Sequence, residues 1–145
     1  MQSLLYGRDR KLDSLFYAWL LATLLSGIPS TLYALLSGGD VMEATRAAGA
    51  MAGRPDSLVA AALVHFAVSA FWAVVLWRLL PARYTAFWAV LASAAIALLD
   101  LKVIAPAFFP EVAALAFWPQ FADHLMWGAC YSVGLSLARP RATRP

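Results

Sequence analysis

Charged residues and cysteines are scarce in this sequence. Only 13% of the 145 residues are charged, against roughly a quarter in ordinary soluble domains. The single cysteine, Cys130, excludes an intrachain disulfide and a metal or redox centre built from several cysteines. Hydrophobic residues make up 63% of the chain instead, and the mean hydropathy is +0.72. This composition indicates an integral membrane protein and leaves little room for a soluble domain.

Recognisable chemical motifs are missing as well. The two histidines do not stand at the spacing of a metal or haem motif, and no serine lies in a nucleophile elbow. The formal net charge of +3 comes from short basic runs beside apolar segments, so nucleic acid is not an expected partner. We therefore expect a non-enzymatic protein with no catalytic residue, no bound metal and no cofactor. The expected partner is the lipid bilayer, with a homo-oligomer or a larger membrane complex as further possibilities.

Four apolar segments are long enough to cross a bilayer, which takes about 20 residues of α-helix. They predict spans over about 15–36, 58–80, 85–104 and 117–138. A weakly amphipathic stretch over about 40–52 lies between two glycine-containing turns and predicts a short interfacial helix between spans 1 and 2. The expected fold is all-α: residues 1–145 form a single transmembrane domain, a four-helix bundle. This layout resembles that of small four-helix proteins of the bacterial inner membrane, and no family signature supports a narrower assignment.

Local signals predict where these helices begin, bend and end. Asp13 and Ser14 are residue types that cap a helix, so they are expected to begin the first span. Pro29 lacks an N–H group and predicts a kink within that span. The third span is expected to end near Ile104, and residues 111–117 to include one short helical turn before Pro119.

The basic residues predict the orientation in the membrane. Eight of the 11 Lys and Arg residues lie at the N-terminus, in the 78–83 loop and at the C-terminus, all on one side of the predicted topology. The other side has three: Arg46, Arg54 and Lys102. The positive-inside rule then places both termini in the cytoplasm of a multi-pass protein of the inner (plasma) membrane. The apolar run after the first basic residues is too long for a signal peptide, so it is expected to remain as a span.

Polar residues recur in every predicted span and at a similar depth. With 1.5 Å of rise per residue, those of the last three spans fall about 6 to 11 Å below the outer face, and the serines of the first span approach that level. Ionisable groups at such depth mark either polar helix contacts or a working site. The predicted cluster in the outer half comprises Ser26, Ser30, His65, Ser69, Asp100, Gln120, Asp123 and His124. We expect Asp123 to pair with His65, and Asp100 with His124.

Several roles fit such a cluster. Its side chains can bind a small ligand or carry a coupled proton, as in many membrane sites. They can instead hold the helices together by buried hydrogen bonds, which suits an accessory or structural subunit of a membrane complex. A haem- or metal-binding protein is a further alternative, because two histidines and two aspartates are suitable ligand types.

Overall fold

The computed structural model describes residues 2–81 and 85–137 of the chain, with side chains from Leu12 onward. Every regular element within these residues is a helix. The helices are α1 (Gln2–Leu25), α2 (Ile28–Ser37), α3 (Glu43–Ala50), α4 (Leu58–Leu79), α5 (Thr85–Leu99), the π-helix η1 (Asp100–Ile104), α6 (Ala105–Phe108), α7 (Pro110–Ala113) and α8 (Phe117–Leu137).

Three segments of the described chain are long and apolar enough to cross a membrane. They are Leu12–Ser37, Leu58–Leu79 and Thr85–Phe108. These segments are compatible with a small multi-pass membrane protein. The fourth predicted span does form a helix of 21 residues, α8, but it is not among the three, because Gln120, Asp123 and His124 lower its mean hydropathy. Four spans and a four-helix bundle therefore stay a prediction, and Ala138, the expected last residue of the fourth span, lies outside the described residues.

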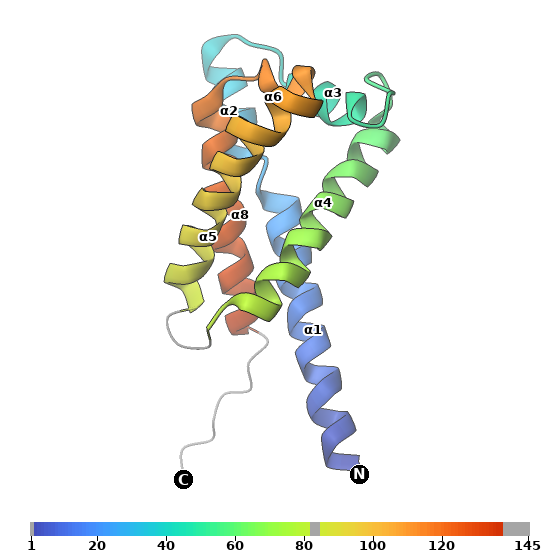
Figure 1. Cartoon of the computed structure of the whole chain (residues 1–145), viewed down its shortest axis with the longest axis vertical. Coiled ribbons are helices and arrows are strands. Elements are labelled where there is room, and N and C mark those ends of the chain that lie inside the picture. The colour runs from blue at the N-terminus through green and yellow to red at the C-terminus, as the bar shows by residue number, and fades with distance from the viewer. Residues whose placement is uncertain (1, 82–84, 138–145) are drawn as a thin grey trace.

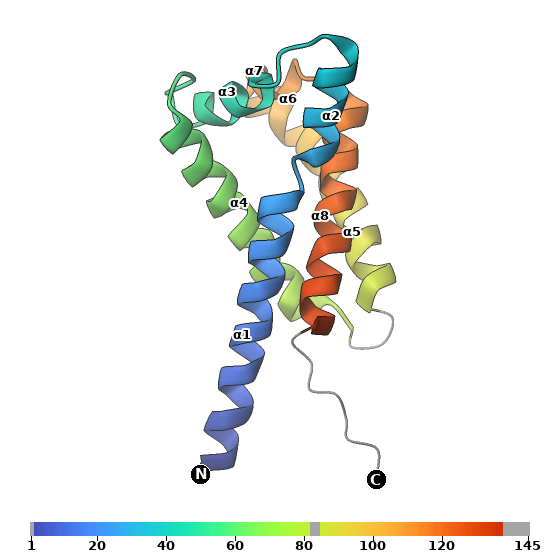
Figure 2. The ribbon, with the colours of Figure 1, turned by 180° about the vertical axis from the view of Figure 1, so that it is seen from behind.

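Helix α8 lies at the centre of the molecule, packed between α1 and α5 (Figure 2). Helix α4 packs against α1 and α3 and leans away from the α5–α8 pair toward one end of the molecule (Figure 1). At that end, which we call the α3 end, the short helices α3, α6 and α7 lie close together. Helix α4 therefore diverges from the α5–α8 pair toward the α3 end.

Two glycines let α8 approach its neighbours closely. A Cβ atom on Gly128 would collide with Ser93 of α5, and one on Gly134 would collide with the backbone of Ala18 in α1. Small residues at helix contacts are the usual means of close packing in membranes, where lipid competes with side chains for apolar contact.

The first predicted span is broken rather than kinked. Helix α1 ends at Leu25 and α2 begins at Ile28, so the break falls at residues 26–27, just before Pro29. Pro29 cannot donate to the carbonyl of Leu25, and its fixed φ suits the first turn of a new helix, where N–H groups have no partner anyway. The expected start at Asp13 and Ser14 is wrong, because both residues lie inside α1, which extends back to Gln2.

The third predicted span also continues past its expected end. At η1 the helix widens, and the Ala105 N–H donates to the Asp100 carbonyl five residues back. The cause is Pro106, which has no N–H and whose ring would meet the Lys102 carbonyl in a regular helix. The helix then continues through α6 to Phe108. The short turn expected over 111–117 occurs slightly earlier, as α7.

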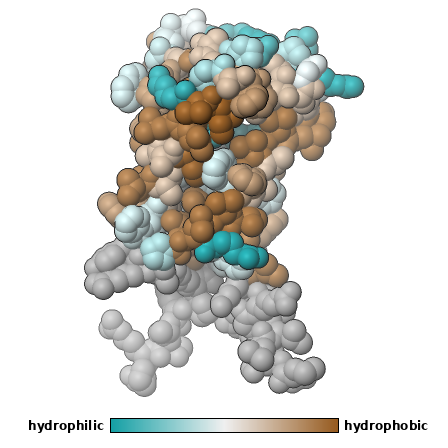
Figure 3. Space-filling view, viewed as in Figure 1, coloured by the Kyte–Doolittle hydropathy of each residue, from teal (hydrophilic) through white to brown (hydrophobic). Residues whose placement is uncertain are grey.

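The surface agrees with a membrane location. Figure 3 shows a mainly hydrophobic face along the long helices, with hydrophilic residues at the α3 end and a smaller number near the opposite end. Many large apolar side chains on this surface are exposed, among them Phe71, Phe87 and Leu98. Exposed apolar side chains at this density suit contact with lipid tails.

Candidate functional site

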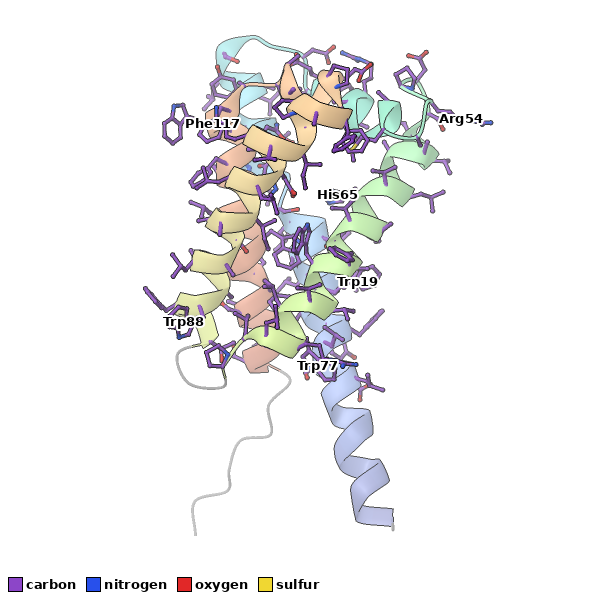
Figure 4. All side chains as sticks on the ribbon, in the orientation of Figure 1. Trp19, Arg54, His65, Trp77, Trp88 and Phe117 are labelled. Carbon is purple, nitrogen blue, oxygen red and sulfur yellow. The ribbon has the colours of Figure 1, made fainter. Side chains whose placement is uncertain are left out.

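A cavity of about 810 Å³ lies between the diverging long helices. Its walls come from α1, α2, α4, α5, η1 and α8, and residues of α3, α6 and α7 line it near the α3 end. All eight residues of the predicted cluster are among its lining residues. His65 lies on the side of α4 that faces the α5–α8 pair (Figure 4). The structure thus brings the predicted residues together, although proximity alone assigns them no function.

His65 and Asp123 cap the two helix ends that face each other at the break in the first span. The His65 Nε2 lies 2.9 Å from the carbonyl oxygen of Thr23, in the last turns of α1, and must donate because a carbonyl only accepts. The Asp123 Oδ1 accepts from the backbone N–H of Ser30, in the first turn of α2, at 2.9 Å. Broken helix ends leave unpaired carbonyls on one side and unpaired N–H groups on the other, and in an apolar setting each needs a partner.

The expected pairing of His65 with Asp123 is therefore replaced. Each side chain makes its hydrogen bond to the backbone of the first span instead of to the other. The physical reason is that a histidine donor suits the carbonyl end of a helix, whereas a carboxylate suits the N–H end. The pairing was predicted for a continuous first span, in which these backbone groups would already have partners.

His124 and Asp100 approach each other as expected. The His124 Nε2 lies 3.5 Å from the Asp100 Oδ2, an ion-pair distance, and each side chain is about a quarter exposed, at 25% and 23%. The His124 Nδ1 lies 2.8 Å from the carbonyl oxygen of Gln120, so Nδ1 must carry a proton and donate it there. A neutral His124 then turns a lone pair toward the carboxyl of Asp100. The contact is attractive only when one further proton sits on His124 or on Asp100, so the pair can hold one proton in common.

A chain of hydrogen bonds in the cavity lining links three helices. The Trp127 indole N–H donates to the Ser69 hydroxyl at 2.7 Å, and the hydroxyls of Ser69 and Thr23 lie 2.5 Å apart. Thr23 donates its own proton to the Trp19 carbonyl at 2.7 Å, so Ser69 is the donor to Thr23. Nearby, the Tyr131 hydroxyl donates to a carbonyl of α4 at 2.8 Å.

Sequence reasoning missed the part that Thr23, Trp127 and Tyr131 play in this network. Thr23 recurs with Ser26 and Ser30 on one stripe of the first span, and the two aromatic residues share the polar face of the last span. A signal was present, because a buried tryptophan or tyrosine usually finds a partner for its polar atom.

Ser93 is a buried polar side chain of the lining that packs against Gly128 of α8. It is 1% exposed, and its hydroxyl has no hydrogen-bond partner among the described residues. The serines at the break differ, because Ser26 and Ser30 each donate to a carbonyl three residues back in their own segment. Sequence reasoning placed Ser93 only on a stripe of small residues.

The charges that line the cavity are unbalanced. Four carboxyl side chains line it, whereas no described Lys or Arg side chain does. The lining acids are Asp40, Glu43, Asp100 and Asp123. At the α3 end, the Arg46 guanidinium bonded to Asp40 holds the pKa of that carboxyl below its usual value, and the Met42 N–H adds to the effect. In the described part of the chain, no three His, Cys, Asp or Glu side chains are grouped so that they could hold a metal ion.

Comparison of the chain with protein-family models, with curated proteins and with solved structures returns no match. The interpretation of the cavity therefore rests on its own geometry.

Proposed function

We propose that this small membrane protein binds a small ligand in the cavity and exchanges the proton of the His124–Asp100 pair as it does so. The supporting observation is that eight polar residues, encoded in four separate stretches, line one cavity of about 810 Å³. This volume lies within the range of about 300–1,000 Å³ that is usual for ligand sites. The role is binding rather than catalysis.

The polar residues divide into two groups by what they contact. His65, Asp123 and Ser69 are occupied by hydrogen bonds to the first span or to other helices. These contacts suit the structural alternative, in which polar residues only hold the helices together. His124 and Asp100 are different, because their contact is attractive only with one further proton on one of them, and that proton can be released. Both side chains also stay partly exposed to the cavity.

We also propose that the α3 end faces the outside and both termini face the cytoplasm. The support is the uneven count of eight basic residues against three, read from the sequence. In this orientation the cavity lies in the outer half of the membrane. A ligand would then reach it from the outer side.

Ligand binding can be tested with the full chain in mild detergent. The unfolding temperature is measured with and without short amphiphiles of three kinds: neutral, anionic and cationic. We expect at least one kind to raise the unfolding temperature by several degrees. Ala62→Phe places a large ring in the cavity lining and should abolish the increase. Leu63→Phe is the matched control, because Leu63 is the next residue of α4, is 66% exposed and does not line the cavity.

Two results would refute ligand binding in this cavity. One is an unfolding temperature that none of the three amphiphiles raises. The other is an increase that survives Ala62→Phe, which would place the amphiphile elsewhere on the protein. The proton is tested separately with His124→Gln, which should flatten the dependence of amphiphile affinity on pH between about 5 and 8, where an ordinary histidine titrates. An unchanged pH dependence would remove the proton from the proposal and leave ligand binding intact.

A further inference from the structure

We infer that the ligand of this cavity is an amphipathic organic cation, an ammonium group on a hydrocarbon body, which enters sideways from the membrane. The inference rests on the proposed function, that the cavity binds a ligand, and names the chemical class of that ligand. Two features of the lining support it: the sign of its charge and its aromatic walls.

The charge of the lining favours a cation over an anion. Of the four lining carboxyl groups, Asp40 is bonded to Arg46 and Asp123 to the backbone of α2. Glu43 is exposed and interacts electrostatically with Arg46, and Asp100 contacts His124. An anionic headgroup would meet these acids without a described Lys or Arg side chain in the lining to bind it, so like charges would oppose its binding.

Aromatic side chains make the apolar part of the cavity suitable for an ammonium group as well as for hydrocarbon. They are Tyr33, Phe66, Phe71, Trp72, Phe109 and Trp127. Aromatic faces attract ammonium ions, most strongly where water is excluded, and they also contact methylene groups. The Trp127 ring is held in place, because it stacks on Tyr131 with ring centroids 5.0 Å apart and donates to Ser69.

The cavity reaches the lipid-facing surface of the molecule. Several apolar residues that line it are exposed on the outside: Leu24 and Tyr33 on the first span are 61% and 51% exposed, and Val68 and Phe71 on α4 are 40% and 59% exposed. A hydrocarbon tail can therefore stay in contact with lipid while the headgroup lies inside.

The test compares three probes with the same eight-carbon chain, namely octylammonium, octanol and octyl sulfate, on the full chain in mild detergent. We expect octylammonium to bind the wild type at least about tenfold more tightly than octyl sulfate, with octanol between them. Glu43→Gln and Asp100→Asn should each lower octylammonium affinity severalfold and leave octanol affinity unchanged. Glu111→Gln is the matched control, since Glu111 is exposed and does not line the cavity.

Equal binding of the three probes, blocked by Ala62→Phe, would overturn the cation and leave ligand binding standing. Preferential binding of octyl sulfate would overturn the cation too, and binding of none of the probes would overturn both proposals.

Discussion

The hydrogen bond between Asp123 and Ser30 can be tested as the N-terminal cap of a helix that begins inside the molecule. Asp123→Ala leaves the Ser30 N–H without its acceptor. Losing a cap costs about 0.5–2 kcal/mol, and a buried polar group left unpaired costs about 1–3 kcal/mol. The two estimates describe the same lost bond and overlap at about 1–2 kcal/mol, which is the expected loss of unfolding free energy.

Asp123→Asn separates the hydrogen bond from the charge. Asparagine keeps an oxygen at the position of Oδ1, so it can still accept from Ser30. What it loses is the attraction between a carboxylate and the start of α2, typically about 0.3–1 kcal/mol. The asparagine variant should therefore lose less than half as much unfolding free energy as the alanine variant.

The assay is reversible unfolding of the full chain in mixed micelles, followed by tryptophan fluorescence. Ser136→Ala serves as the control for removing a polar side chain from α8, because the Ser136 hydroxyl bonds only to a carbonyl three residues back. This control should change the unfolding free energy by less than about 0.5 kcal/mol. A loss below that value for Asp123→Ala, or equal losses for the alanine and asparagine variants, would refute the capping role.

Three further predictions concern helix contacts and the α3 end. Gly134→Ala should cost about 1–3 kcal/mol in the same unfolding assay, because the added methyl group meets the backbone of α1, and an unchanged free energy would contradict the close packing. Tyr131→Phe should cost about 0.5–1.5 kcal/mol by removing one buried hydrogen bond to α4, and a neutral result would show that this bond contributes nothing. The pKa of Asp40 is lowered in the folded chain by its bond to Arg46, so the pair stabilises the turn above the ordinary aspartate pKa. That stabilisation should be lost as pH falls through the lowered pKa, seen as a fall in amide exchange protection at the start of α3. Arg46→Gln should make this fall smaller, because only the Met42 N–H then still favours the carboxylate.

Helix positions in this protein follow well from sequence because they depend on local composition. The apolar run over 58–80 corresponds closely to α4, and the stretch over 40–52 contains α3. The convergence of the eight polar residues on one cavity also followed from helix faces and depths, which depend on spacing alone.

Pairings across helices were harder to predict. Asp100 and His124 meet as expected, but the partners of His65 and Asp123 depend on where the first span breaks. Pro29 signalled an interruption, and nothing in the sequence showed whether the helix would bend or stop. Once it stops, the exposed backbone groups compete for any nearby donor or acceptor, and they outcompete a side-chain partner that also needs a fixed distance and angle.

The break in the first span leaves backbone groups that need partners from other helices. A continuous helix would satisfy its own backbone and would need neither His65 nor Asp123 at this depth. This chain instead uses two ionisable residues from two other helices to cap a helix break that borders the cavity. Departures from local helix rules that are compensated by distant residues are typical of functional sites. The same cavity is also lined by His124 and Asp100, whose contact is attractive only with one further proton on one of the two side chains. The proposed ligand binding with proton exchange accounts for the caps and for this contact together, whereas a structural role accounts only for the two caps.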